Sequence, residues 1–319
     1  MIRTLILAAL AAALLASVAM PLAPLAGLVE TDPALARALL VELRLPRALL
    51  ALLYGATLGA TGAAVQALFA NPLASPDITG TTSGAALGAV IAAYWLGASG
   101  PFGLAVGAVA GAMIALFALV ALAGRRAETA TLLLAGLVIS AFAGALATLA
   151  LALAPSPFAF YDAYDWLMGS LVDRSLAQAA FAGVPAAAVI FLLWRLEAPL
   201  DSLTLGEEVA ASFGHDIAAI RLRIVALTAI GIGACVAVCG AVGFIGLVAP
   251  ILARGLTRSH PGRAILPAAL IGALLLIAAD LAVRLAPLDR TIPIGVLTAL
   301  LGAPFFLFYV AQMRWRLAR

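Results

Sequence analysis

The sequence contains no lysine, and only 10% of its 319 residues are charged. All 18 basic residues are therefore arginine. A nucleotide-binding P-loop needs the lysine of its GxxxxGK[ST] pattern. This chain cannot form such a loop, so any P-loop ATP hydrolysis has to reside on another chain.

Cysteine and histidine are also scarce, with two residues of each. Cys235 and Cys239 are four residues apart in an apolar run, which predicts small, buried side chains on one helix face rather than a clamp between elements. His215 and His260 fall in polar stretches, so neither predicts more than an ordinary loop or interface residue. We therefore expect no catalytic residue, metal or cofactor on this chain.

Hydrophobic residues make up 65% of the chain, and the mean hydropathy is +1.17. A soluble domain is near half apolar. Aromatic residues account for only 7%, so the excess is Ala, Leu, Val, Gly and Ile, which are typical of packed transmembrane helices. The composition predicts an all-α polytopic membrane protein embedded in a lipid bilayer. The net charge of +3 comes from arginines scattered between apolar runs, which does not favour a nucleic-acid partner.

Apolar runs between charged or Pro/Gly breaks predict ten spans. The first resembles a secretory signal, but it is long and many runs follow, so we interpret it as a retained helix. The eighth is too short to cross a ~30 Å hydrocarbon core and should be a half-length helix shielded by others. The predicted spans are 5–28, 46–68, 80–97, 101–123, 130–153, 176–196, 222–242, 244–256, 265–286 and 292–311.

The distribution of arginine predicts the orientation. An N-terminus inside leaves twelve arginines in cytoplasmic segments and six outside, and an even number of spans returns the C-terminus to the same side. We expect a multi-pass membrane protein with both termini in the cytoplasm.

A weak internal repeat links residues 55–63 to residues 233–241 through the pattern GAxx[GA]xxGA, at an offset of 178 residues. The same offset carries Pro72 onto Pro250 and Gly84 onto Gly262. Five spans separate the copies, which would invert the second, as in many transporters. The alternative is chance alignment in a chain rich in Gly and Ala. We treat 1–319 as one transmembrane domain, with repeat halves of about 46–153 and 222–311.

Few charged residues fall within the predicted spans. Asp280 and Arg284 are four residues apart and can pair on one helix face. Alternatively, Arg284 joins Arg44 and Arg47 in a positive outer rim that binds acidic residues of a docking protein. Because ion-coupled transporters usually carry mid-membrane Asp, Glu or His, an external energy source is favoured. An ion-coupled secondary transporter of a small solute is the alternative.

Two uncharged residues in the spans leave their roles open. Gln66 either lines a pathway or hydrogen-bonds across a helix interface. Ser83 lies in the Gly-rich sequence GTTSGA, which invites comparison with an intramembrane serine protease, but no histidine lies in a span to act as its base.

Two segments lie outside the predicted spans. Residues 155–174 contain Tyr and Trp, which suit either an interfacial helix or docking of a partner. Residues 198–221 are amphipathic, with Leu205, Val209 and Phe213 at helical spacing and Gly214 as a stop signal. We interpret this second segment as a short surface helix that meets another protein.

Seven segments, taken together and in order, resemble the FecCD-type permeases, the transmembrane subunits of type II ABC importers for iron chelates, haem and cobalamin. The resemblance extends from Arg44 to the C-terminus. The matching segments are RLPR at 44–47, 55–85 around ANPLA, LLLAGLVISA at 132–141, WLMGSL at 166–171, LGEEVAASFG at 205–214, GFIGLVAP at 243–250 and PIGVLTALLGAPFFLF at 293–308.

The resemblance implies a homodimer of ten-helix subunits that works with two ABC ATPase subunits, which bind ATP and Mg, and with a periplasmic substrate-binding protein. It also implies roles for particular residues. These are a cytoplasmic gate at Asn71, Pro72 and Leu73; ATPase coupling at Leu205, Gly206, Glu207, Glu208, Ala210, Phe213 and Gly214; and binding-protein docking at Arg44, Arg47 and Arg284. Separately, we consider Gln66, Ser83 and Ser140 as candidates to line the pathway.

The chain departs from the family pattern at two positions. Ile251 follows Pro250 where the family usually has histidine, and Phe213 stands where leucine is commoner. The pathway residues say little about the ligand. From the resemblance we expect an iron–siderophore first, with haem and cobalamin as alternatives.

Overall fold

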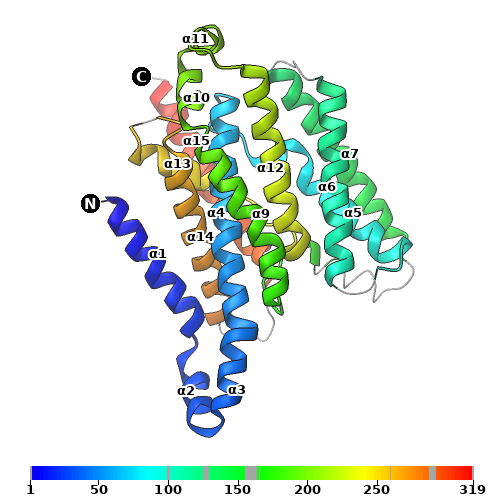
Figure 1. The fold of residues 1–319 in the computed structure, drawn as a ribbon, viewed down its shortest axis with the longest axis vertical. Coiled ribbons are helices and arrows are strands. Elements are labelled where there is room, and N and C mark those ends of the chain that lie inside the picture. Colours follow the sequence, from blue (N-terminus) through cyan, green and yellow to red (C-terminus); the bar gives the residue numbers. More distant parts are fainter. Residues whose placement is uncertain are drawn as a thin grey trace.

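The computed structural model describes residues 2–98, 101–124, 129–154, 164, 166–258, 260–286 and 292–317, and in these residues it contains helices and no strand (Figure 1). The fold class is all-α, as predicted. Short π and 3-10 segments occupy Leu39–Arg44, Pro76–Thr79 and Leu203–Leu205. The α-helices are α1 (Ile2–Ala19), α2 (Leu22–Thr31), α3 (Pro33–Ala38), α4 (Leu45–Leu68), α5 (Thr81–Trp95), α6 (Pro101–Ala123), α7 (Thr129–Ala152), α9 (Leu176–Trp194), α10 (Glu197–Ser202), α11 (Glu207–Ser212), α12 (Ile217–Cys239), α13 (Ile245–Leu256), α14 (Ile265–Leu285) and α15 (Ile294–Leu317).

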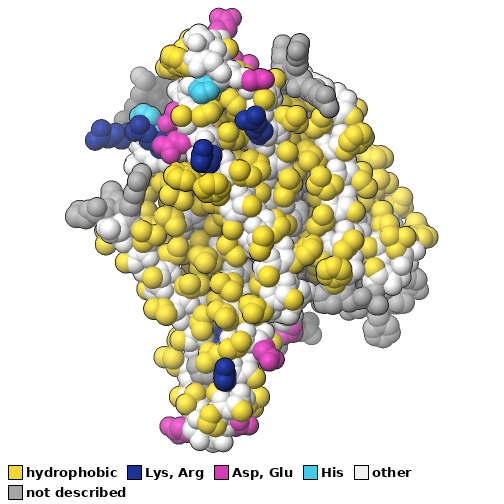
Figure 2. All heavy atoms as spheres, in the orientation of Figure 1, with side chains coloured by type: hydrophobic (Ala, Val, Ile, Leu, Met, Phe, Trp, Pro, Cys, Tyr) yellow, Lys and Arg dark blue, Asp and Glu magenta, His cyan; other side chains and the backbone are white. Residues whose placement is uncertain are grey.

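Most long helices run side by side between two ends of the molecule, which we call the α11 end and the α3 end (Figure 1). In Figure 2, hydrophobic side chains cover most of the visible face, and charged side chains gather toward the two ends. Six helical stretches in the described residues are long and apolar enough to cross a membrane. Three apolar helices are shorter, and α13, with 12 residues, is one of them, as predicted for the eighth span.

The predicted first span, residues 5–28, is wrong at its end. Helix α1 stops at Ala19, and α2 begins at Leu22 after Pro21. Proline has no amide to donate, and the helix breaks at Pro21. The chain then turns into α3, which Asp32 caps by accepting from the amides of Ala34 and Leu35 at 3.1 and 3.0 Å. The π segment joins α3 to α4 in one continuous helical stretch, Pro33–Leu68.

Helix α4 lies at the centre of the molecule and contacts α14, α9, α13 and α12. Its glycines allow this close packing. A Cβ at Gly55 would lie 2.4 Å from the Gly272 carbonyl oxygen, and one at Gly59 would lie 2.0 Å from that of Ala268. Small residues at a helix interface let two backbones approach closely in a membrane. The Gly/Ala repeat in α4 therefore forms the tight contact with α14.

The 178-residue offset does not bring equivalent elements together. It pairs Pro72, which follows the end of α4, with Pro250, which is buried inside α13. It also pairs Gly84 within α5 with Gly262 in the turn before α14. The non-helical break near Pro250 is residues 240–244, ahead of α13. At this offset the breaks near Pro72 and Pro250 therefore do not coincide, and the inverted repeat stays a prediction.

Candidate functional site

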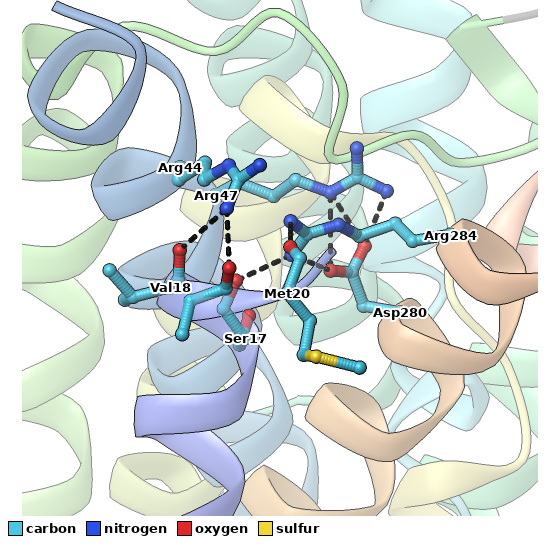
Figure 3. A network of polar contacts seen from close by, with 8 residues as sticks. Ser17, Val18, Met20, Arg44, Arg47, Asp280 and Arg284 are labelled. Carbon is cyan, nitrogen blue, oxygen red and sulfur yellow. Dashed lines mark hydrogen bonds and ion pairs between the residues drawn. The ribbon is translucent and has the colours of Figure 1, made fainter. Parts of the chain in front are cut away.

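Four charged residues at the α3 end form what we call the arginine cluster: Arg44, Arg47, Asp280 and Arg284 (Figure 3). The Nε of Arg47 donates to Asp280 Oδ1 at 2.8 Å and to Oδ2 at 3.1 Å, and its Nη2 lies 2.8 Å from Oδ1. Asp280 is 1% exposed, so this is a buried ion pair between α4 and α14. Arg284 Nη1 lies 3.8 Å from Asp280 Oδ2, so the predicted i, i+4 pair is present but is the longer of the two.

The other two guanidinium groups bind the end of α1. Arg44 donates to the carbonyl oxygens of Val18, Ala19 and Pro21 at 3.2, 2.7 and 3.2 Å. Arg284 donates to the carbonyl oxygens of Ser17, at 2.6 Å, and Met20.

The last carbonyls of a helix have no partner within it and carry partial negative charge, so the two arginines act as a cap on α1. The structure thus brings together Arg44, Arg47 and Arg284, as the outer-rim hypothesis requires. In this conformation, however, the three guanidinium groups contact Asp280 and the carbonyl oxygens at the end of α1. Their role in docking stays a prediction.

A cavity of about 560 Å³ opens beside the arginine cluster. Arg47 and Asp280 line one side, and Trp166, Arg174 and Pro293 line others. The Nε of Arg174 is buried without a hydrogen-bond partner in the described residues. The cavity therefore combines an aromatic wall with arginine donors, an arrangement that suits a bulky ligand or protein segment with acceptor groups.

Tyr54 holds the irregular loop next to this cavity, and sequence analysis did not identify it. Its buried hydroxyl donates to the Gly240 carbonyl oxygen at 3.0 Å and accepts from the Val242 amide at 3.2 Å. The WLMGSL segment joins the same loop, because the Ser170 amide donates to the Cys239 carbonyl oxygen at 2.8 Å. Of the predicted outer segment 155–174, residues 155–163 and 165 lie outside the described residues.

The predicted gate follows the end of α4, at the α11 end. The Asn71 side chain accepts from the Leu73 amide at 2.9 Å, and the Asn71 amide donates to the Gln66 carbonyl oxygen at 3.1 Å. These bonds fold residues 69–73 into a compact turn that includes Pro72. The turn is partly exposed, which leaves it accessible to a permeating molecule or a second chain.

Gln66 is fully buried, and its Nε2 donates to the Leu247 carbonyl oxygen at 3.2 Å. The structure thus favours the helix-interface alternative, here between α4 and α13. Its Oε1 has no hydrogen-bond partner in the described residues. Ser83 and Ser140, the two other predicted pathway residues, lie 3.0 Å apart between their hydroxyl oxygens and link α5 to α7.

Helices α10 and α11, with the turn between them, form a projection at the α11 end (Figure 1). Leu205 is 60% exposed and Phe213 is 62% exposed, whereas Ala210 is buried. Gly206 and Gly214 bound α11 with positive φ angles of 100° and 86°, which glycine adopts without strain. Glu208 is exposed between them.

Two polar contacts fix this projection to the membrane helices. Glu207 Oε1 lies 2.6 Å from Nη2 of the buried Arg221 on α12. Asp201 Oδ1 accepts from the Gly262 amide at 2.7 Å, just before α14. A displacement of the exposed apolar face would therefore be transmitted to α12 and to the turn that precedes α14.

The cysteine prediction is confirmed, because Cys235 and Cys239 are both free and buried in α12. His215 and His260 lie between helices, also as predicted. Among the residues that the structure describes, no group of three or more His, Cys, Asp or Glu side chains could hold a metal ion.

Comparisons with known proteins agree on one family. The FecCD transport family matches residues 4–312. The vitamin B12 import system permease protein BtuC of Vibrio cholerae is 39% identical over 282 residues, which cover 85% of this chain and 82% of the relative. BtuC of Salmonella typhimurium is 41% identical over 278 residues, with 85% and 83% covered.

Two solved structures share the fold. An inward-facing metal-chelate type ABC transporter aligns with a TM-score of 0.87 and 28% identity over 98% of this chain and 99% of that one. PsaBC from Streptococcus pneumoniae, in complex with Fab, aligns with a TM-score of 0.51 and 18% identity over 90% and 94% of the two chains, which supports the fold alone.

Proposed function

Because the chain belongs to the FecCD transport family as a permease subunit of an ABC importer, we propose that it imports vitamin B12 through a pathway formed with a second copy of itself. Permeases of this family work with an ATPase and a binding protein, and the present chain has no lysine for a P-loop of its own. ATP and Mg therefore bind the partner subunit.

The observation that carries the ABC-importer part of this proposal is the apolar projection at the α11 end. Leu205, Val209 and Phe213 are 60%, 40% and 62% exposed on a segment tied to α12 and α14 by an ion pair and a hydrogen bond. Exposed apolar groups that lie together favour a protein contact. We assign this face to the ATPase, whose closure on ATP would move α12 and α14. The α11 end then lies in the cytoplasm, and we place both termini on that side because the arginine distribution predicts it.

The α3 end then faces the periplasm and receives the binding protein. The aromatic and arginine-lined cavity lies there, beside the arginine cluster. Carboxylates of a docked protein would compete with Asp280 for Arg47 and with the α1 carbonyls for Arg44 and Arg284. Docking would thereby loosen the contact between α1, α4 and α14.

The gate closes the opposite end. The turn at Asn71, Pro72 and Leu73 follows α4 directly, and Gln66 ties this end of α4 to α13. A shift of α13 would therefore move the turn. Ser83 and Ser140 couple α5 to α7 in the same way and contribute hydroxyl groups to the pathway.

For the substrate, the BtuC relatives favour vitamin B12 over the iron–siderophore that sequence analysis placed first. The metal-chelate type transporter keeps an iron chelate as the second candidate. The test is uptake by proteoliposomes that contain the permease, its ATPase and its binding protein, with labelled cyanocobalamin, a ferric siderophore and haem offered in parallel. ATP-dependent cobalamin uptake supports the proposal. Uptake of only the ferric chelate or haem would show that vitamin B12 is not the substrate.

The same vesicles separate the ABC importer from a secondary transporter. Uptake should stop without ATP and persist when a protonophore removes the proton gradient. The opposite result would favour ion coupling. A crosslink between two copies of the permease in the same vesicles tests the homodimer.

A further inference from the structure

A second large cavity, of about 480 Å³, lies at the α11 end between α1 and the α13–α14 pair. Helix α1 diverges from α14 toward its N-terminus (Figure 1), and the cavity occupies this space. Its wall is made by Ile6, Leu7, Leu256, Leu266 and Leu270. Such a wall offers nothing to a soluble polar ligand but suits a hydrocarbon chain.

Two arginines, Arg258 and Arg263, stand at the same cavity. Basic side chains gather on this side of the α11 end, at the upper left of Figure 2. Arg258 is exposed, with a positive φ of 51°, and no hydrogen bond or ion pair engages it within the described residues.

Arg263 is 58% exposed, and its Nε lies 3.7 Å from both Glu197 Oε1 and Asp201 Oδ2. These separations exceed those of charge-assisted hydrogen bonds, so this guanidinium keeps capacity for a stronger anionic partner. Helix α14 also begins at Ile265 beside the cavity, and its positive end adds to the attraction for an anion.

We propose that this cavity binds an anionic phospholipid. One acyl chain lies along the leucine wall, and the phosphate contacts Arg258 and Arg263. Basic pockets between transmembrane helices on the cytoplasmic side are suited to such headgroups. The assignment to the inner leaflet rests on the proposed orientation, whereas the binding chemistry depends only on the cavity. A free phosphate would use the arginines but not the apolar wall.

The lipid would fill the space between α1 and α14 at the end where they separate. Its role is to hold α1 beside the bundle, while Arg44 and Arg284 hold the other end of α1.

The experiment is native mass spectrometry of the detergent-solubilised complex, titrated with phosphatidylglycerol or phosphatidylcholine of identical acyl chains. We expect preferential retention of phosphatidylglycerol. The double variant Arg258→Gln, Arg263→Gln should lower its apparent affinity by roughly tenfold or more, because two arginines beside an anionic headgroup are removed. Arg223→Gln, which removes an exposed arginine from α12, serves as the matched control and should bind as the wild type does.

Two further measurements distinguish binding of a phospholipid from binding of a free phosphate group. Leu266→Trp fills the apolar wall and should reduce retention of both lipids. Millimolar glycerol phosphate should not displace the lipid. The proposal is overturned if the double variant binds like the wild type, if Arg223→Gln loses as much affinity, or if glycerol phosphate competes. Lipid retention is measured without substrate or ATP, so its failure is distinguishable from a failure of cobalamin uptake.

Discussion

Asp280→Asn tests whether the arginine cluster stabilises the α3 end. The variant keeps the shape of the side chain but removes the carboxylate that Arg47 contacts at 2.8 Å and Arg284 at 3.8 Å. Breaking a buried ion pair from one side costs about 3–5 kcal/mol. Because Arg47 is 17% exposed, water relieves part of its lost pairing, so we expect about 3 kcal/mol. At about 2 °C per kcal/mol for a large chain, the Tm should fall by roughly 6 °C.

The assay is thermal and denaturant unfolding of the purified permease in detergent. Glu42→Gln is the matched control, because Glu42 is exposed near the same end and its change should stay within about 0.5 kcal/mol. A double-mutant cycle with Arg47→Gln isolates the pair, for which we expect a coupling of about 1–3 kcal/mol. A Tm for Asp280→Asn equal to that of Glu42→Gln, or a coupling near zero, would refute the argument.

Three further predictions concern other contacts. Gly62→Ala places a methyl group 1.9 Å from a backbone carbonyl oxygen of α13, so the Tm should fall by an amount equivalent to about 1–3 kcal/mol. The control Gly255→Ala places its methyl group in open space and should not lower the Tm. Leu205→Glu with Phe213→Glu should abolish substrate-stimulated ATPase activity without lowering the Tm, and retained stimulation would exclude this face as the ATPase contact. Burial raises the pKa of the Asp77 carboxyl above its ordinary range. The wild type should therefore lose stability as pH rises from that ordinary range through the raised pKa, and Asp77→Asn should gain stability relative to the wild type over the same interval. Parallel pH profiles of the two proteins would contradict this.

Local sequence patterns predicted the helical elements well, because the composition and length of an apolar run depend only on the residues of that run. The apolar run at 244–256 was too short to span a membrane, and α13 has 12 residues. The amphipathic spacing of Leu205, Val209 and Phe213 predicted a surface segment, and all three are exposed. This exposed apolar face could thus be located from sequence, although the ion pair that joins Glu207 to Arg221 could not.

The partners of the charged residues could not be predicted in the same way. Helical spacing identifies neighbours on one helix, so it found Arg284 for Asp280 but not Arg47, which is 233 residues away in sequence. The same limit hid the two hydrogen bonds of Tyr54 to residues after α12. Such contacts depend on which helices pack together, and the Gly/Ala faces that decide this packing occur on several helices.

The arginines of the cluster are already paired with Asp280 and with the end of α1, and this adds a free-energy cost to docking of the binding protein. A partner can shift this end only by the difference between its affinities for the paired and the released arginines. Carboxylates that take Arg47 leave Asp280 buried without its nearest partner, a cost of several kcal/mol. Docking at these arginines is therefore favourable only if α14 moves and Asp280 gains another donor or water. If the binding protein docks here, docking would act as a switch for the contact between α1, α4 and α14. A docked state with the Arg47–Asp280 pair intact would show that the binding protein uses a different surface.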